Sequence, residues 1–158
     1  PVVYRAVLDA LADLPIRVLM TVGEAVDPVA LGPLPANASV ERWVPQAEIL
    51  PRVAVVVGHG GYGTVLGALA AARPMVILPL FADQPVNAAR VAALGAGLAL
   101  PGGAVPDPGQ AIASVHLLPE AVTRVLSDPT FTQAAGRVAA EIGELPPVDA
   151  AVGMLAAL

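Results

Sequence analysis

The chain has 158 residues, of which 56% are hydrophobic and 13% are charged, and its net charge is −5. This length suits one domain with its own core, and this composition excludes an intrinsically disordered chain. The absence of cysteine and lysine excludes disulfide scaffolds, cysteine-based zinc sites, Schiff-base lysines and the lysine of Walker-type phosphate sites, and the acidic balance argues against a nucleic-acid surface.

The first third of the chain predicts one helix followed by buried strands. Apolar residues at helical spacing predict a helix over 3–14, which Pro15 ends. Short apolar runs predict three strands: 16–22, 39–44 and 53–57. Between them lie a Pro/Gly-containing loop, 23–37, and a short helix, 45–50. The third strand is almost pure valine, which is typical of a parallel sheet covered on both faces.

The rest of the chain continues the alternation. A glycine-rich turn over 58–63 leads into a helix of small residues over 64–72, and strands are predicted over 75–80 and 97–100. Between those strands a helix is predicted that begins with Asp83 as its cap and runs to Leu94. The Gly/Pro-rich segment 101–114 is expected to be a mobile loop. Three helices follow: 117–127, 130–143 and 148–158. Alternating strands and helices predict an α/β sandwich with a parallel sheet.

The glycine turn Gly58-His59-Gly60-Gly61-Tyr62-Gly63-Thr64 carries the clearest chemical signal. It follows an apolar strand and opens a helix, so its backbone can approach a ligand closely and the free N–H groups of the helix suit anionic oxygens, phosphate above all. His59 and Thr64 add side-chain donors. A turn that merely packs a helix on the sheet is the alternative, and the Gly-x-Gly-x-x-Gly spacing also fits a dinucleotide site.

Two further groups stand at the ends of strands, where α/β sheets place ligands. The single tryptophan, in Trp43-Val44-Pro45-Gln46, could stack on a nucleobase or belong to the core. Asp83-Gln84 opens the helix after the fourth strand. Asp83 could serve only as a helix cap, whereas the amide of Gln84 could bind hydroxyl groups.

The block from 43 to about 100 resembles the nucleotide-sugar-binding half of GT-B glycosyltransferases, above all the bacterial enzymes that attach deoxysugars to antibiotics and other natural products. The resemblance is carried by several motifs at matching spacing: Trp43-Val44-Pro45-Gln46, Leu50-Pro51, His59-Gly60-Gly61-x-Gly63-Thr64, Ala68-Leu69, Pro74, Pro79, Asp83-Gln84-x-x-Asn87-Ala88 and Leu94-Gly95-x-Gly97. It implies a Rossmann-like three-layer sandwich, the C-terminal half of a GT-B fold, with extra C-terminal helices.

The resemblance also implies a role for each site residue. Trp43 would stack on the base, the main chain of Val44 would bond the edge of the base, and Gln46 would lie near the ribose. His59 and the N–H groups of Gly60, Gly61, Tyr62, Gly63 and Thr64 would hold the diphosphate, with Tyr62 bordering the sugar. Asp83 and Gln84 would bind hydroxyls of the donor sugar.

One departure bears on the nucleotide. Many relatives place a glutamate three residues after Thr64, where it holds both ribose hydroxyls, and this chain has Gly67 there. A dTDP-sugar lacks the ribose 2′-hydroxyl, so we expect dTDP to be preferred over UDP. No Asp-x-Asp sequence occurs, so we expect no metal and no other cofactor.

The implied reaction is an inverting transfer of a hexose to a small-molecule acceptor such as a polyketide or antibiotic aglycone. Its general base would be a histidine of an N-terminal acceptor domain that these residues do not include, so we expect no catalytic residue here and no turnover by residues 1–158 alone. The first strand of the donor domain is also expected to be absent, which makes 1–158 a single, incomplete donor-binding domain.

The expected setting is cytoplasmic, without a membrane span or nucleic acid, and a homodimer or an auxiliary protein stays open as a partner. Two other functions stay open as well. One is a dinucleotide-binding oxidoreductase domain, and the other is a module that binds nucleotide sugars without catalysis. NAD binding in the absence of dTDP binding would favour the first.

Overall fold

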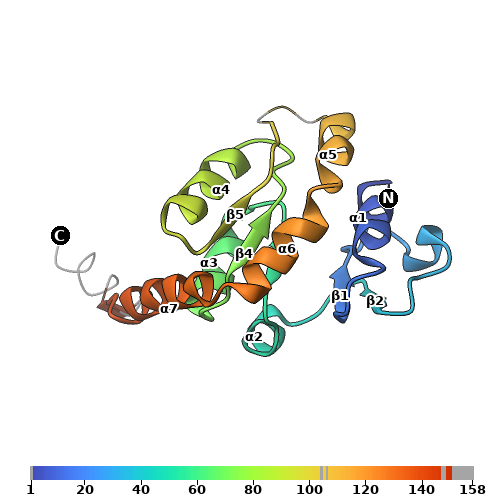
Figure 1. Cartoon of the computed structure of the whole chain (residues 1–158). Coiled ribbons are helices and arrows are strands. Elements are labelled where there is room, and N and C mark those ends of the chain that lie inside the picture. Colours follow the sequence, from blue (N-terminus) through green and yellow to red (C-terminus); the bar gives the residue numbers. More distant parts are fainter. Residues whose placement is uncertain (1, 104, 106, 147–148, 151–158) are drawn as a thin grey trace.

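The computed structural model describes residues 2–103, 105, 107–146 and 149–150, and it consists of parallel strands and helices that alternate along the chain (Figure 1). One sheet pairs β1 (Val18–Thr21) with β2 (Ala38–Glu41). The other has the order β3 (Val56–Gly58), β4 (Met75–Ile77) and β5 (Gly97–Ala99). All of these pairs are parallel, as the continuous apolar runs predicted, but the strands form two sheets that divide between β1 and β3.

Apart from α5, which the sequence did not predict, the helices follow the predicted order. They are α1 (Val2–Leu11), α2 (Gln46–Ile49), α3 (Tyr62–Ala70), α4 (Gln84–Ala93), α5 (Pro108–Val115), α6 (Leu118–Ser127) and α7 (Pro129–Gly143). Two short 3₁₀ segments, Pro28–Leu31 and Leu50–Arg52, lie in the connections. The predicted helix over 148–158 lies outside the described residues, apart from 149–150.

Strand β4 and the residue after it lie at the centre of the core, because alternate side chains point to opposite faces of the sheet. Met75 and Ile77 pack with apolar side chains of α3, α4 and α7. Val76 and Leu78 pack on the other face with side chains of α1, α5 and α6. All four are at most 5% exposed, and full burial of such a side chain contributes about 1.5–3 kcal/mol. Helices therefore cover both faces, which confirms the three-layer arrangement.

The prediction of a mobile loop over 101–114 is wrong in its second half, where α5 forms. Asp107 is the N-cap of this helix, and its carboxylate accepts hydrogen bonds from the backbone N–H groups of Gly109 and Gln110, at 2.9 and 3.3 Å. The helix buries Ala111, Ser114 and Val115 and packs against α1. This capping and burial outweigh the local Gly/Pro content. His116 is the C-cap of α5.

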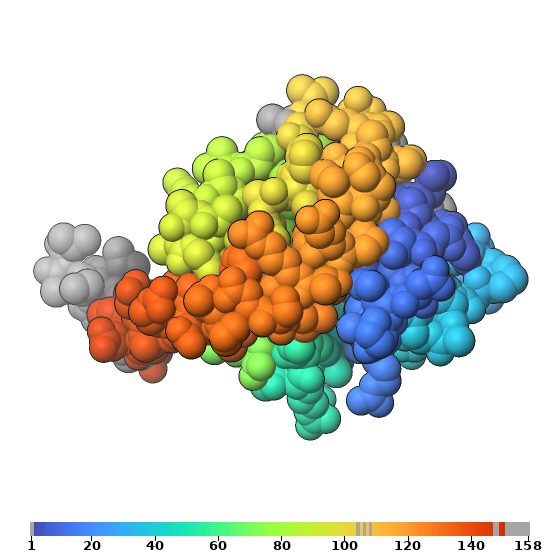
Figure 2. Space-filling model, viewed as in Figure 1, coloured from blue at the N-terminus to red at the C-terminus, as the bar shows by residue number. Residues whose placement is uncertain are grey.

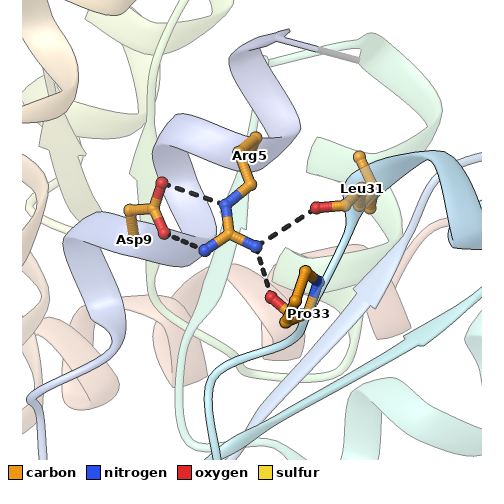
Figure 3. A network of polar contacts seen from close by, with 4 residues as sticks. All are labelled: Arg5, Asp9, Leu31 and Pro33. Carbon is orange, nitrogen blue, oxygen red and sulfur yellow. Dashed lines mark hydrogen bonds and ion pairs between the residues drawn. The ribbon is translucent and has the colours of Figure 1, made fainter.

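The segment after β1 is fastened to α1 by Arg5 (Figure 3). Its guanidinium donates to the carbonyl oxygens of Leu31, at 3.1 Å, and of Pro33, while Asp9 on the next turn of α1 accepts from the same group. These hydrogen bonds, with the positive charge of Arg5, hold the pKa of Asp9 below its ordinary value. The connection from β1 to β2 is therefore held at the surface of α1.

On the face shown in Figure 2, the side chains of α6 and α7 form one continuous surface and α1 lies beside α5 and α6. The core reaches across the division between the sheets, because Val18 of β1 packs on the same apolar cluster as Val55 and Val57. Among the described helices, none has both the length and the apolar character needed to cross a bilayer.

Candidate functional site

The site lies where the parallel strands end. Thr21 of β1 lies opposite Glu41 of β2, and Gly58 of β3 lies opposite Ile77 of β4. In each sheet, paired strands therefore stop at the same level, and the loops that follow them meet at one edge. Every candidate residue from the sequence is in one of these loops or in the first turn of the helix after it.

A cavity of about 380 Å³ opens at the ends of β1 and β2. Its lining residues are Thr21, Gly23, Arg42, Trp43, Val44 and Gln46. Trp43 is 68% exposed, so it is not a core residue, and its ring is free to stack on a flat ligand. The structure thus brings together the predicted Trp43, Val44 and Gln46.

Sequence reasoning missed three lining residues, Thr21, Gly23 and Arg42. The backbone N–H of Gly23 donates to the carbonyl of Arg42 at 2.9 Å, which holds the two strand ends side by side. The rule that neighbouring parallel strands end at one edge is the signal that could have found them. Arg42 also lies 3.6 Å from Asp27, the N-cap of the 3₁₀ segment.

The glycine turn places a row of backbone donors at the start of α3. The first N–H groups of a helix have no partner within it, and Gly61, the N-cap residue, has no side chain to cap them. The positive end of the helix dipole lies at the same point. A Cβ built on Gly61 would lie 2.6 Å from Nε2 of His59, so the imidazole ring lies directly over this turn. His59, Gly61 and the amides that follow thus form one surface of groups that can donate hydrogen bonds.

Gly60 sets the path of this turn. Its φ is +90°, a conformation that side chains other than glycine rarely adopt. A Cβ there would lie 2.8 Å from Cγ2 of Ile77 and 3.2 Å from the backbone oxygen of Gln84. The turn is therefore packed against both β4 and the start of α4, with no space for a side chain.

The cavity beside Trp43 and the glycine turn are joined by side chains. Nε2 of Gln46, at the start of α2, lies 3.4 Å from Oγ1 of Thr64, in the first turn of α3. A Cβ on Gly67, one turn further along, would lie 3.2 Å from Cδ1 of Leu50 and 3.9 Å from Oε1 of Gln46. Position 67 therefore faces the amide of Gln46, at the border between the two parts of the site.

Asp83 and Gln84 have different environments at the start of α4. Asp83 is exposed and stands at the N-cap position, but its side chain makes no capping bond, so its interpretation as a helix cap is wrong. Its Oδ2 accepts instead from Nδ2 of Asn87, at 2.9 Å. Gln84 is 4% exposed, and its Oε1 accepts from the backbone N–H groups of Leu80 and Phe81, at 2.9 and 3.1 Å. Its oxygen thus closes a turn, which leaves Nε2 as its group for a ligand.

In the part of the chain that the structure describes, no three histidine, aspartate or glutamate side chains gather into a group that could hold a metal ion. The candidate residues and the cavity lining offer backbone amides, side-chain amides, hydroxyls, the imidazole of His59, the carboxylate of Asp83 and the guanidinium of Arg42. Such a set recognises an anion by hydrogen bonds and a neutral hydroxylated ligand by the carboxylate and amides.

Comparison with known proteins identifies the family. Residues 5–158 match the family described as "Erythromycin biosynthesis protein CIII-like, C-terminal domain", and the chain belongs to this family. It is 43% identical over 122 residues to the elloramycin glycosyltransferase ElmGT of Streptomyces olivaceus, an alignment that covers 77% of this chain and 28% of that protein. It is 33% identical over 147 residues to the NDP-glycosyltransferase YjiC of Bacillus subtilis, covering 90% of this chain and 38% of that protein. The chain thus spans only 28% and 38% of the length of these two relatives.

Solved structures agree with this assignment. The spinosyn rhamnosyltransferase SpnG complexed with thymidine diphosphate superposes with a TM-score of 0.85 at 30% identity, over 98% of this chain and 40% of that one. The glycosyltransferase VinC in complex with dTDP gives a TM-score of 0.81 at 28% identity, over 96% of this chain and 36% of that one. The fold is therefore that of the C-terminal domain of GT-B glycosyltransferases, as the motifs predicted.

Proposed function

We propose that this chain binds a nucleoside diphosphate sugar and is the donor-binding part of a glycosyltransferase that acts on a natural product. The observation that carries the proposal is the uncapped start of α3 with His59 over Gly61, adjoining the cavity beside Trp43. The base would stack on Trp43, the N–H groups and His59 would hold the diphosphate, and Asp83 with Nε2 of Gln84 would bind sugar hydroxyls. Gln46 lies between the cavity and the glycine turn, where a ribose would connect the base to the diphosphate.

We propose dTDP as the preferred nucleotide. Position 67 faces Oε1 of Gln46 at the border between base and diphosphate, and it carries no carboxylate that could bind a ribose 2′-hydroxyl. Two solved relatives with this fold are described as complexes with dTDP or thymidine diphosphate, which supports the same choice.

In the proposed reaction, an acceptor hydroxyl attacks the anomeric carbon with inversion and the nucleoside diphosphate leaves. Negative charge grows on the leaving diphosphate, and the donors at the start of α3 are oriented before the reaction to stabilise it. The general base and most of the acceptor site would belong to a separate N-terminal domain. We therefore propose that residues 1–158 bind the donor without turning it over.

We also propose that one more parallel strand, from outside residues 1–158, completes the sheet. Within the described residues, β1 pairs only with β2, and the second sheet begins at β3. A parallel strand between β1 and β3 would join the two sheets into one, in the order β2, β1, added strand, β3, β4, β5. This is the strand order of a doubly wound nucleotide-binding sheet. Val18 and Val57 already share one apolar cluster across this division.

Calorimetric titration with dTDP, UDP, dTMP and NAD tests the binding proposal. We expect dTDP to bind most tightly, UDP less tightly because Gly67 offers nothing to its extra hydroxyl, and dTMP weakly because it lacks the second phosphate. Binding of NAD without binding of dTDP contradicts the proposal and favours a dinucleotide domain.

Trp43→Ala tests whether the cavity beside Trp43 binds the base of dTDP. We expect it to lower dTDP affinity about fivefold to a hundredfold, because base stacking on an aromatic ring contributes about 1–3 kcal/mol. Leu145→Ala is the matched control, since Leu145 is an equally exposed apolar residue beyond the end of α7. Equal affinities of the two variants for dTDP contradict the assignment of the base to this cavity.

A further inference from the structure

Asn87, in α4, contacts both the glycine turn and Asp83. Its Nδ2 donates to the carbonyl oxygen of Gly60 at 3.0 Å and to Oδ2 of Asp83 at 2.9 Å. Asn87 is 7% exposed, so these bonds are made where water competes little. A single amide group thus bonds to two loops that follow different strands, β3 and β4.

The bond to Gly60 sets the direction of a neighbouring donor. A peptide unit is planar and trans, so the carbonyl of Gly60 and the N–H of Gly61 point in opposite directions. Asn87 holds this carbonyl toward α4, and the N–H of Gly61 therefore points away from α4. The φ of +90° at Gly60 leaves this peptide without the usual steric restraint, because glycine tolerates many conformations.

The bond to Asp83 sets the direction of a carboxylate. Oδ2 accepts from Asn87, so Oδ1 is the oxygen left for a ligand. The backbone supports the same geometry, since the N–H of Asn87 donates to the carbonyl of Asp83 at 3.1 Å. An exposed aspartate would otherwise move among several rotamers, and ordering it when the ligand binds would cost affinity.

We propose that Asn87 is a positioning residue that fixes the diphosphate donors and the sugar-binding carboxylate in one geometry. This inference rests on the proposed function of the site, and it assigns to Asn87 no contact with the ligand. Because both bonds come from the same Nδ2, loss of this amide weakens the contacts to the diphosphate and to the sugar together.

The test is calorimetric titration of the chain with dTDP and with dTDP-glucose. Asn87→Ala and Asn87→Leu, whose side chain is neutral and of similar shape, both remove the two donated bonds. We expect each to lower dTDP affinity about tenfold to a hundredfold, which corresponds to one hydrogen bond to a charged group, and to lower dTDP-glucose affinity further. Asp83→Ala removes only the sugar contact, so its loss falls mainly on dTDP-glucose.

Asn37→Ala is the matched control. Nδ2 of Asn37 also donates two hydrogen bonds, to the carbonyls of Leu11 and Leu14 at 3.0 and 3.3 Å, but it lies just before β2, at the end opposite the site. We expect this variant to lower the melting temperature and to leave both affinities within twofold of the unsubstituted chain. If the Asn87 variants behave like Asn37→Ala, the positioning role is wrong.

A spectroscopic measurement on the unsubstituted chain keeps the test independent of variant folding. In ¹H–¹⁵N spectra, the amide of Gly61 is expected to shift when dTDP is added. No shift at Gly61 while dTDP binds overturns the role of Asn87 and the assignment of the diphosphate to this amide, but it leaves the binding of dTDP by the chain standing. No binding of dTDP or dTDP-glucose by the unsubstituted chain overturns the proposed function itself.

Discussion

Gly60→Ala tests the idea that backbone conformation and close packing together shape the anion site. Alanine at a φ of +90° costs about 1–2 kcal/mol. Its methyl group would also lie 2.8 Å from Cγ2 of Ile77 and 3.2 Å from the backbone oxygen of Gln84, and overpacking of this kind costs about 1–3 kcal/mol. We therefore expect a loss of about 2–5 kcal/mol in the free energy of unfolding.

Two other glycines separate these costs. Gly23 has a φ of +73° and nothing within 4 Å of the position that a methyl group would take, so Gly23→Ala carries only the conformational cost of about 1–2 kcal/mol. Gly136 lies inside α7, also with nothing within 4 Å, and Gly136→Ala should stabilise the chain by about 0.5–1 kcal/mol. The expected order of stability is Gly136→Ala, the unsubstituted chain, Gly23→Ala and Gly60→Ala.

Urea unfolding followed by circular dichroism measures this series, with dTDP titration of each folded variant beside it. Gly60→Ala must shift the neighbouring peptide, so it should weaken dTDP binding even where the protein remains folded. A Gly60→Ala variant that is no less stable than Gly23→Ala would refute the packing cost at this turn. The link from turn to ligand is refuted if folded Gly60→Ala binds dTDP as the unsubstituted chain does.

Three further outcomes are expected. Arg42→Ala should lower dTDP affinity several-fold in calorimetry but change the melting temperature little, because its pair with Asp27 is half exposed and such pairs contribute about 0–1 kcal/mol. Asp128 caps α7, and hydrogen bonds from the hydroxyl and backbone N–H of Thr130 hold the pKa of Asp128 below its ordinary value. The stabilisation by this carboxylate is therefore present above about pH 4 and is lost as the pH falls through the lowered pKa. In urea unfolding, the stability lost in Asp128→Ala should accordingly become smaller below about pH 4. Titration of dTDP at rising NaCl should lower the affinity by no more than the several-fold contribution of Arg42, and a steeper fall would contradict binding mainly by neutral donors.

The sequence predicted the fold well where local and tertiary preferences agree. The runs 53–57 and 75–80 are continuous apolar segments, and both contain strands because helices cover both faces of the sheet there. The turn after β3 was likewise predictable, since glycines between an apolar strand and a helix allow few alternatives. Segment 101–114 was mispredicted because its glycines and prolines are typical of a loop. The same segment contains a helix start that was overlooked, with Asp107 as the N-cap and Pro108 as the first residue of α5.

The candidate site was predictable in its residues more than in its roles. Trp43 and the glycine turn were found from their places at strand ends, and the structure brings them to the same edge. Gln84 was assigned by its amide alone, and only the folded chain shows that its oxygen is used by the backbone of Leu80 and Phe81. The link from Asn87 to Gly60 spans 27 positions, a contact that no local pattern encodes.

The charge of the chain now has a structural explanation. A net charge of −5 repels an anionic ligand at long range, and of the eight arginines only Arg42 lines the cavity beside Trp43. The donors at the start of α3 are neutral N–H groups, whose attraction depends on direction and short distance and is screened little by salt. Such donors work only when the backbone is held still, which is why the packing of Gly60 and the two bonds of Asn87 matter more here than any added positive charge.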